Sequence, residues 1–149
     1  MIFVTTLQFL LIIFIATYLV INIIYLVRLC PIMDELVSYP YISVCIPARN
    51  EERDIEDCVK SLLNQNYPNF EVIVVDDNST DNTAKIIYSM KKQYPNLIFV
   101  AGAKLISGWV GKPYALHQAY QRSRGQYLLF TDADLMYKPH ALNTAMHTM

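Results

Sequence analysis

The sequence lacks several features that would place it in common classes of protein. It has only four glycines, and no Gly-x-Gly-x-x-Gly follows the first expected strand, so the usual dinucleotide-binding loop is absent. The phosphate-loop pattern that ends in Gly-Lys-Ser/Thr is absent as well. The net charge is −1 and the lysines and arginines are scattered, which argues against a nucleic-acid-binding surface. Any phosphate that this chain binds must therefore be held by other means.

Cysteine is also scarce. Cys30, Cys45 and Cys58 are odd in number and do not have the spacing of metal ligands. We therefore expect free thiols that serve packing, in a protein that works in a reducing compartment.

The beginning of the chain lacks charge. Residues 1–27 contain no acidic or basic side chain and consist mainly of Leu, Ile, Val and Phe. This segment is longer than the roughly 20 residues that a helix needs to cross a bilayer. A cleavable signal peptide is the competing interpretation, but a basic leading region and a small-residue cleavage site are missing and the apolar core is too long. We predict a single transmembrane helix over residues 1–29 and a linker over 30–40. Arg28 favours a cytoplasmic C-terminal domain at the cell membrane under the positive-inside bias.

From Tyr41 onward, short apolar runs alternate with amphipathic stretches. The expected strands are residues 42–46, 72–75, 97–100 and a buried run at 127–130, and the expected helices are 51–65, 80–94, 112–124 and one that starts at Pro139. We expect Pro47 to stop the first strand, Asn50 to cap the helix after it and Gly125 to close the third helix. Because strand and helix alternate, the predicted class is α/β, a mostly parallel sheet with helices on both faces.

Polar residues follow three of the four expected strands. Residues 47–51 follow the first strand, Asp76 and Asp77 the second, and Asp132 and Asp134 the fourth. Alternation along an extended backbone places Asp132 and Asp134 on the same face. Ligands bind beyond the carboxyl ends of parallel strands, and Mg²⁺ or Mn²⁺ binds one or two carboxylates together with substrate phosphates. We therefore expect these acids to gather at one rim of the sheet and to bind a diphosphate through a divalent cation.

These residues also have structural interpretations. Asp76 and Asp77 could cap the next helix together with the short polar residues that follow them. Lys112 could be a solvated charge at the start of a helix, and Glu51 could only favour a helix amino terminus. Trp109 is expected to pack.

Four segments resemble the successive motifs of family 2 glycosyltransferases, in order and at similar spacing. They are residues 43–51, 74–81, 111–116 and 131–134, and the resemblance covers nearly all of 41–149. It implies a Rossmann-like GT-A nucleotide-diphospho-sugar-binding fold, anchored to a membrane by the amino-terminal helix. It also implies a hexosyltransferase-type enzyme that takes its sugar from a nucleotide-diphospho-sugar with divalent metal assistance. Members that act on lipid or carotenoid-type acceptors are most similar in layout, and the acceptor itself is left open.

The resemblance implies roles for individual residues on the nucleoside side of the site. Pro47, Arg49 and Glu51 would line the nucleoside pocket, partly through backbone groups. Asp77 would accept a hydrogen bond from the base, with Asp76 nearby.

Further roles are implied on the phosphate side. Lys112 resembles the basic residue that faces the nucleotide or its diphosphate. Asp132 would contact the ribose or the sugar and lie at the metal, and Asp134 would coordinate Mg²⁺ or Mn²⁺.

The sequence also departs from the family. Members continue with further strands, an acidic motif that supplies the general base for the acceptor hydroxyl and, in many, a Gln/Arg-x-x-Arg-Trp element, and none of these follows Met149. We therefore expect the donor-binding half of a transferase, inactive or nearly so alone, with an uncovered apolar edge or face of its sheet. A non-catalytic nucleotide-sugar-binding subunit that needs a partner chain for the acceptor site is the alternative. A nucleotidyltransferase of related fold is disfavoured, because residues 47–50 are not a Gly-rich loop with a basic residue.

Overall fold

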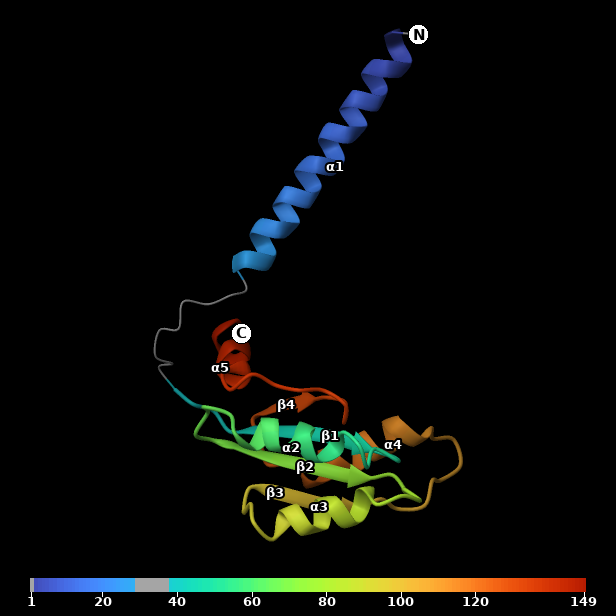
Figure 1. Cartoon of the computed structure of the whole chain (residues 1–149), viewed down its shortest axis with the longest axis vertical. Coiled ribbons are helices and arrows are strands. Elements are labelled where there is room, and N and C mark those ends of the chain that lie inside the picture. The colour runs from blue at the N-terminus through green and yellow to red at the C-terminus, as the bar shows by residue number, and fades with distance from the viewer. Residues whose placement is uncertain (1, 29–37) are drawn as a thin grey trace. The chain divides into compact units, whose positions relative to one another are not determined.

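A computed structural model describes residues 2–28 and 38–149, and the chain divides into two compact units (Figure 1). The unit Leu36–Asn143 contains the whole sheet, and the helix α1, Ile2–Arg28, belongs to the other. Within α1, Gln8–Tyr25 has a mean hydropathy of 2.2 and no buried residue, so it has the length and composition of a helix that could cross a membrane. Its Thr17 and Asn22 side chains each donate to a backbone carbonyl one turn earlier, which satisfies them without water. Most of the predicted linker, 30–40, lies outside the described residues.

The sheet has four parallel strands in the order β3-β2-β1-β4. The strands are β1 (Ile42–Ala48), β2 (Phe70–Asp76), β3 (Leu97–Ala101) and β4 (Tyr127–Phe130). All seven residues of β2 are buried, as expected for a continuous β-branched run that is covered on both faces. The predicted parallel sheet is confirmed, and each of the first three strands is longer than predicted.

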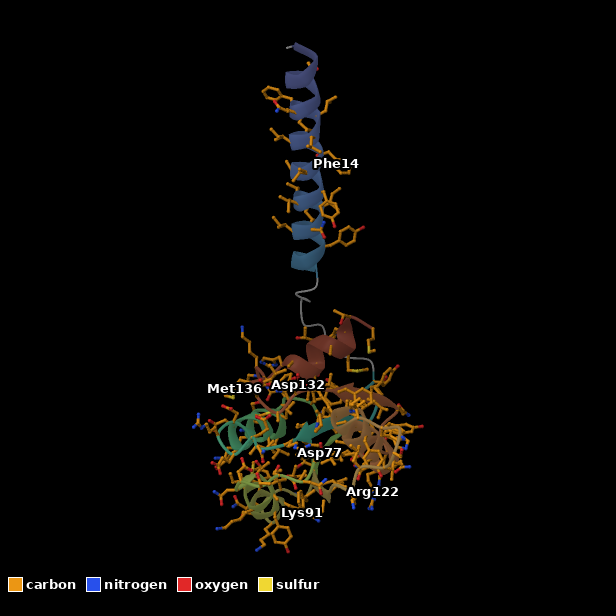
Figure 2. The ribbon with its side chains drawn as sticks, turned by 90° about the vertical axis from the view of Figure 1, so that its right-hand side faces the viewer. Phe14, Asp77, Lys91, Arg122, Asp132 and Met136 are labelled. Atoms are coloured by element: carbon orange, nitrogen blue, oxygen red, sulfur yellow. The ribbon has the colours of Figure 1, made fainter. Side chains whose placement is uncertain are left out.

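Helices cover both faces of the sheet, as predicted. Helices α2 (Ile55–Leu63) and α3 (Thr83–Lys91) lie on one face and α4 (Gly111–Arg122) on the other (Figures 1 and 2). Against α4, Cys45, Ile73 and Val75 form a buried cluster with the alanines of that helix. The chain adds β2 and β3 on one side of β1 and then returns to add β4 on the other side. Because the connections between parallel strands are right-handed, this reversal places α4 on the opposite face and creates a switch point between β1 and β4. This switch point is where such sheets bind ligands.

Pro47 lies inside β1, although the sequence predicted that it would stop the strand. Its Cα lies opposite Val75 of β2. The N–H of Thr131 donates to the carbonyl of Cys45 at 3.1 Å, so the backbone groups of alternate β1 residues from Cys45 onward face β4. Pairing with β4 ends where Cys45 lies opposite Phe130, and Pro47 is two residues further on. Its missing N–H therefore faces a position beyond the end of β4, which explains why the strand continues.

Gly125 does not close α4 as predicted. The helix ends at Arg122, and its C-cap residue Ser123 has an extended backbone. A Cβ at Gly125 would lie 2.4 Å from the backbone N of Ser43, and the N–H of Gly125 donates to Ser43 Oγ at 2.8 Å. Glycine is needed here because the chain passes in close contact with β1 before it enters β4.

Strand β4 is not the buried run that the sequence predicted. Tyr127 is 41% exposed and Phe130 is 50% exposed. The reason is its position, because β4 lies at the edge of the described sheet and pairs only with β1 there. Tyr127 and Phe130 are therefore exposed at an edge of the described sheet, while the two leucines between them are partly buried.

The last helix, α5 (Ala141–His147), begins two residues after Pro139, where the sequence predicted its start. The N–H of Leu142 donates to the side-chain oxygen of Gln65, and the N–H of Asn66 donates to the carbonyl of Pro139. The start of α5 is therefore held by the residues that follow α2.

Candidate functional site

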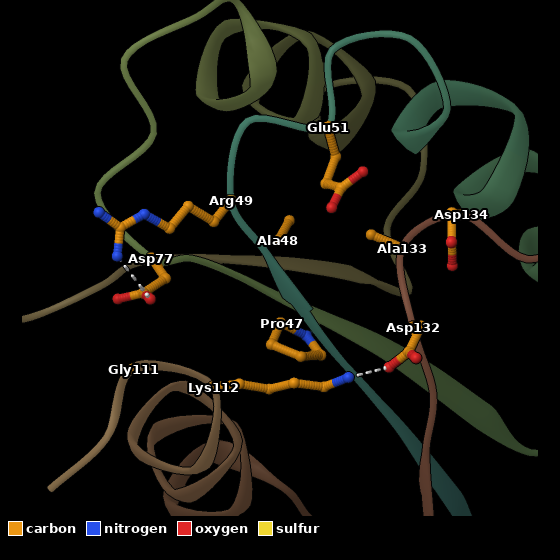
Figure 3. Close-up of a pocket in the computed structure, with 10 residues that line it drawn as sticks. All are labelled: Pro47, Ala48, Arg49, Glu51, Asp77, Gly111, Lys112, Asp132, Ala133 and Asp134. Carbon is orange, nitrogen blue, oxygen red and sulfur yellow. Dashed lines mark hydrogen bonds and ion pairs between the residues drawn. The ribbon is translucent and has the colours of Figure 1, made fainter.

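A cavity of about 290 Å³ opens at the carboxyl ends of β1, β2 and β4, at the switch point of the sheet (Figure 3). It is lined by Pro47, Ala48, Arg49, Glu51, Asp77, Gly111, Lys112, Asp132, Ala133 and Asp134. Seven of the eight residues that the sequence singled out are in this set, and Asp77 and Asp134 open onto the same space. Small-molecule pockets typically measure about 300–1,000 Å³, so this cavity suits part of a nucleotide-sugar-sized ligand.

Asp77 forms one wall of the cavity. It is 7% exposed, its N–H donates to the carbonyl of Ala48 at 2.7 Å, and its Oδ2 lies 3.7 Å from Nη1 of Arg49. A Cβ at Gly111 would lie 2.9 Å from Oδ2 of Asp77, so the glycine at the start of α4 gives this carboxylate room. A buried carboxylate with a positive neighbour can accept a hydrogen bond from a ligand N–H in a fixed direction.

Asp76 is the one predicted site residue that does not line the cavity. It ends β2, and alternation sends its side chain to the face opposite that of Asp77. It is 8% exposed, and its Oδ1 atom is buried without a hydrogen-bond partner among the residues that the structure describes. The adjacent aspartates therefore have different surroundings, which two identical letters in a sequence do not distinguish.

Two carboxylates, Asp132 and Asp134, lie on the side of the cavity opposite Asp77, and in Figure 3 a third, Glu51, lies between Arg49 and Asp134. Glu51, Asp132 and Asp134 all line the cavity, and Figure 3 places Glu51 and Asp134 at its upper rim. Burial raises the pKa of Glu51 above its ordinary value, and the charges of Asp134, Asp54, Asp81 and Asp132 raise it further. The cavity therefore concentrates negative charge that a bound cation would stabilise.

The donor set on this side fits a divalent cation that takes part of its coordination from a substrate. Among the described residues, no group of three His, Cys, Asp or Glu side chains is arranged to hold a metal by itself. Mg²⁺ and Mn²⁺ sites that serve phosphate chemistry typically use one or two carboxylates plus substrate phosphates and waters. Asp132 and Asp134 match that requirement.

The segment that carries Asp132 and Asp134 is attached to α2. The Cys58 thiol donates to the carbonyl of Asp132 at 3.5 Å, and the N–H of Tyr137 donates to Ser61 Oγ at 3.0 Å. The hydroxyls of Thr131 and Tyr137 are hydrogen-bonded to each other. Burial raises the pKa of Cys58 to about 11, so this thiol is neutral and its role is packing and positioning. Neither Cys45 nor Cys58 is in a disulfide.

The loops that follow β1 and β2 are joined by hydrogen bonds, which we call the loop clasp. Asn50 donates its N–H to Ser79 Oγ at 3.0 Å and accepts from the N–H of Thr80 at 2.8 Å, while Glu51 N–H donates to Thr83 Oγ1 at 2.8 Å. Glu52 makes further bonds to Asp81 and Asn82. The clasp fixes Arg49 and Glu51 relative to Asp77.

The loop clasp corrects the sequence prediction for Asn50. This residue was expected to cap a helix starting at Glu51, but α2 begins at Ile55 with Asp54 at its N-cap position. Helix α3 likewise begins at Thr83 and ends at Lys91, inside the predicted range 80–94. The polar side chains near both helix starts bond across the two loops, which explains why both helices begin late.

Sequence reasoning did not single out three of the lining residues. Ala48, Gly111 and Ala133 are small and leave space between the charged groups. Gly111 directly precedes Lys112, so its position at a helix start was a usable signal. Trp109 contacts α4, with its ring centroid 4.9 Å from that of His117, but it is 40% exposed, so it is less buried than the predicted packing role implies.

Residues 43–149 match the family model for glycosyl transferase family 2. The beta-monoglucosyldiacylglycerol synthase of Nostoc sp. is 37% identical over 99 residues, which are 65% of this chain and 21% of that protein. S. aureus TarS 1-349, crystallised in complex with UDP-GlcNAc, has 34% sequence identity and a TM-score of 0.60 over 72% of this chain and 30% of its own. The mannosyltransferase PcManGT from Pyrobaculum calidifontis, in complex with GDP-Man and Mn²⁺, has 26% identity and a TM-score of 0.63 over 91% of this chain and 41% of its own. The chain thus spans less than half the length of each of these proteins.

Proposed function

The chain belongs to glycosyltransferase family 2 and has its Rossmann-like GT-A fold, and from this we propose that its cavity binds the nucleotide-diphospho-sugar donor of a hexosyl transfer. One observation carries the proposal. A buried acceptor, Asp77, and a group of exposed acids, Asp132 and Asp134, line the same cavity at the switch point of the sheet. A nucleotide-sugar has a base at one end and a diphosphate toward the other, so the base could meet Asp77 while the diphosphate lies near Asp132 and Asp134.

On the nucleoside side, Asp77 would accept a hydrogen bond from an N–H of the base. Arg49, whose Nη1 lies 3.7 Å from Oδ2 of Asp77, would help to hold that carboxylate in place. Pro47 and Glu51 would border the nucleoside, and Asp76 would support β2 and not contact the ligand. The complexes of TarS with UDP-GlcNAc and of PcManGT with GDP-Man support a nucleotide-sugar as the ligand and leave the base open.

On the phosphate side, Asp134 and Asp132 would hold Mg²⁺ or Mn²⁺. A bound divalent ion would supply positive charge that stabilises the diphosphate as it leaves. Lys112, in the first turn of α4, would add a further positive charge next to the phosphates. The Mn²⁺ in the PcManGT complex supports a divalent ion in general.

We propose that the general base for the acceptor is a residue that does not line this cavity. All four carboxylates that line the cavity have donor-side roles in this assignment, so the base that takes the proton of the acceptor hydroxyl would lie outside this set. A non-catalytic nucleotide-sugar-binding subunit that works with a partner chain is the alternative. Co-purification with a partner chain that carries the acidic base for the acceptor hydroxyl would favour that alternative.

We also propose that α1 anchors the protein in the cell membrane as a single span, with the domain in the cytoplasm. The apolar composition of α1 and Arg28 at its end support this. The name of the Nostoc relative, a diacylglycerol glycolipid synthase, supports a lipid-type acceptor.

The donor site can be tested by calorimetric titration of the full chain, purified in detergent, with UDP, GDP and their sugars, with and without Mn²⁺. We expect Mn²⁺ to tighten the binding of one nucleotide by about tenfold or more, about 1.4 kcal/mol. Asp134→Ala should abolish this dependence, because it removes a carboxylate from the cation. Asp57→Ala, on the exposed side of α2, is the matched control and should behave like the wild type. Unchanged metal dependence in Asp134→Ala would refute the metal assignment, and no binding of any nucleotide would refute the proposed function.

A further inference from the structure

An ion pair spans the cavity between α4 and the end of β4. The ammonium Nζ of Lys112 lies 2.6 Å from Oδ1 of Asp132, as Figure 3 shows. The two side chains are 59% and 53% exposed, so neither is locked in place by packing. The pair therefore joins two exposed charged groups of the same site.

This contact occupies an oxygen that a divalent cation would need. A lysine ammonium at hydrogen-bond distance neutralises one negative charge of the cavity and adds positive potential that opposes a second cation. With Lys112 paired, Asp134 and Glu51 are the other carboxylates near Asp132 at the cavity. A cation that approaches Oδ1 of Asp132 without any phosphate must therefore displace Lys112 and leave its ammonium near the site.

A diphosphate changes this balance. Lys112 is the second residue of α4, where backbone N–H groups at the helix amino terminus favour phosphate. Phosphate oxygens there would give the ammonium a new partner, and its long, exposed side chain can reach a new position without disturbing the core. Asp132 would then be free to bind a cation.

We propose that Lys112 is the residue that makes divalent-cation binding depend on the diphosphate of the donor. In the free protein Lys112 stands in for the cation at Asp132, and it transfers to the diphosphate when the donor binds. The inference rests on the proposed donor-binding function and adds an order to it. Because coupling between two ligands is reciprocal, the cation strengthens diphosphate binding by the same factor.

The test measures Mn²⁺ binding to the full chain in detergent, by the electron paramagnetic resonance signal of free Mn²⁺, without any nucleotide. Lys112→Met removes the charge and keeps an unbranched side chain. We expect it to bind Mn²⁺ alone about two- to fivefold more tightly than the wild type, the factor that an exposed ion pair can contribute. With UDP or GDP present, whichever binds, the factor by which Mn²⁺ and nucleotide strengthen each other should be smaller in Lys112→Met than in the wild type.

Two control variants separate this role from general charge effects. Lys104→Met removes the same charge from the exposed loop before α4 and should leave Mn²⁺ affinity unchanged. Lys112→Arg keeps the charge and should restore the coupling between cation and nucleotide. The inference is overturned if Lys112→Met binds Mn²⁺ alone no better than the wild type, or no better than Lys104→Met.

The outcome can be separated from that of the proposed function. If no nucleotide binds to the wild type, the proposed function fails, while the titration with Mn²⁺ alone still reports whether Lys112 competes for Asp132. If nucleotide binds and Mn²⁺ affinity is the same in both proteins, the donor site stands and the role of Lys112 is wrong.

Discussion

Glu51 is an acidic residue whose surroundings oppose its charge. It is partly buried at the cavity, and burial together with Asp134 and other nearby acids raises its pKa. The folded chain therefore binds this proton more tightly than the unfolded chain does. Ionisation of Glu51 lowers the free energy of unfolding as the pH rises from the ordinary value of 4.5 through the raised one, the opposite of a carboxylate in an ion pair.

Replacement of Glu51 by glutamine should therefore stabilise the protein at neutral pH. We expect Glu51→Gln to have a higher Tm than the wild type at pH 7 and the same Tm well below pH 4.5, where both side chains are neutral. Thermal unfolding followed by circular dichroism at several pH values measures this. Glu56→Gln, at an exposed position of α2, is the control and should change stability by no more than about 0.5 kcal/mol at any of these pH values. A Tm for Glu51→Gln that is lower than the wild-type value at pH 7 would contradict the expected charge strain.

Neighbouring residues can also differ in which surface of the sheet their side chains reach. Asp76 and Asp77 are adjacent in sequence, but only Asp77 lines the cavity. Gly111 leaves space for the Asp77 carboxylate, and a side chain at that position would contact it at 2.9 Å. The sequence showed that two acids follow β2, but it did not show that only the second of them lines the cavity.

At the scale of elements, the loop clasp holds the two loops that carry the nucleoside side of the cavity. Its central residue, Asn50, has a φ of 57°, in the left-handed region that side chains other than Gly, Asn and Asp rarely adopt. Asn50 contributes both its backbone conformation and the side-chain oxygen that accepts from Thr80. The two contributions can be separated by mutation.

Asn50→Ala should lose both contributions and Asn50→Gly only one. We expect Asn50→Ala to lower the free energy of unfolding by about 2 kcal/mol, about 1 from the left-handed backbone and about 1 from the hydrogen bond. Asn50→Gly should lose about half as much, because glycine adopts the positive φ without penalty. Chemical denaturation followed by the fluorescence of Trp109, which packs against α4, measures both. If alanine and glycine are equally destabilising, the backbone conformation of Asn50 contributes nothing and this interpretation is wrong.

At the scale of the whole molecule, an apolar helix and an α/β domain occur in one chain. Each described side chain from Gln8 to Tyr25 is exposed, and the window contains no charged residue. Exposed apolar side chains of this density are stable in a bilayer and not in water. Membrane insertion of α1 and the domain boundaries near residues 30 and 41 stay predictions.

Insertion can be tested with charges in the centre of α1. The wild-type chain should remain with membranes after extraction with alkaline carbonate and keep its amino-terminal residues. Ile12→Asp/Ile15→Asp should be released, since each aspartate at a helix centre opposes insertion by about 2.5–3.5 kcal/mol. Ile12→Ala/Ile15→Ala is the control that shortens the same side chains without charge and should stay in the membrane fraction. Release of the wild type by carbonate would contradict a membrane span, and loss of its amino-terminal residues would indicate a cleaved signal peptide.

The sequence by itself determined the features that depend on local composition and order. The uncharged run of α1, the β-branched run of β2 and the alternation of strands with helices predicted the elements and a parallel sheet. Because the carboxyl ends of parallel strands lie at one edge, the residues after them were predicted to lie together, and seven of the eight line one cavity. These inferences succeeded because each needs only the periodicity of a segment and the chain direction.

Only the tertiary structure decided which partner each polar or exposed group meets. Pro47 remains in β1 because β4 ends two residues earlier, and β4 is exposed because it is an edge strand. Asn50 bonds to the loop after β2 and does not cap α2, the helix that follows it in the chain. Lys112 pairs with Asp132, which is 20 residues away in sequence. Such partners are distant in the chain and are selected by the packing of several elements at once, which local sequence patterns do not encode.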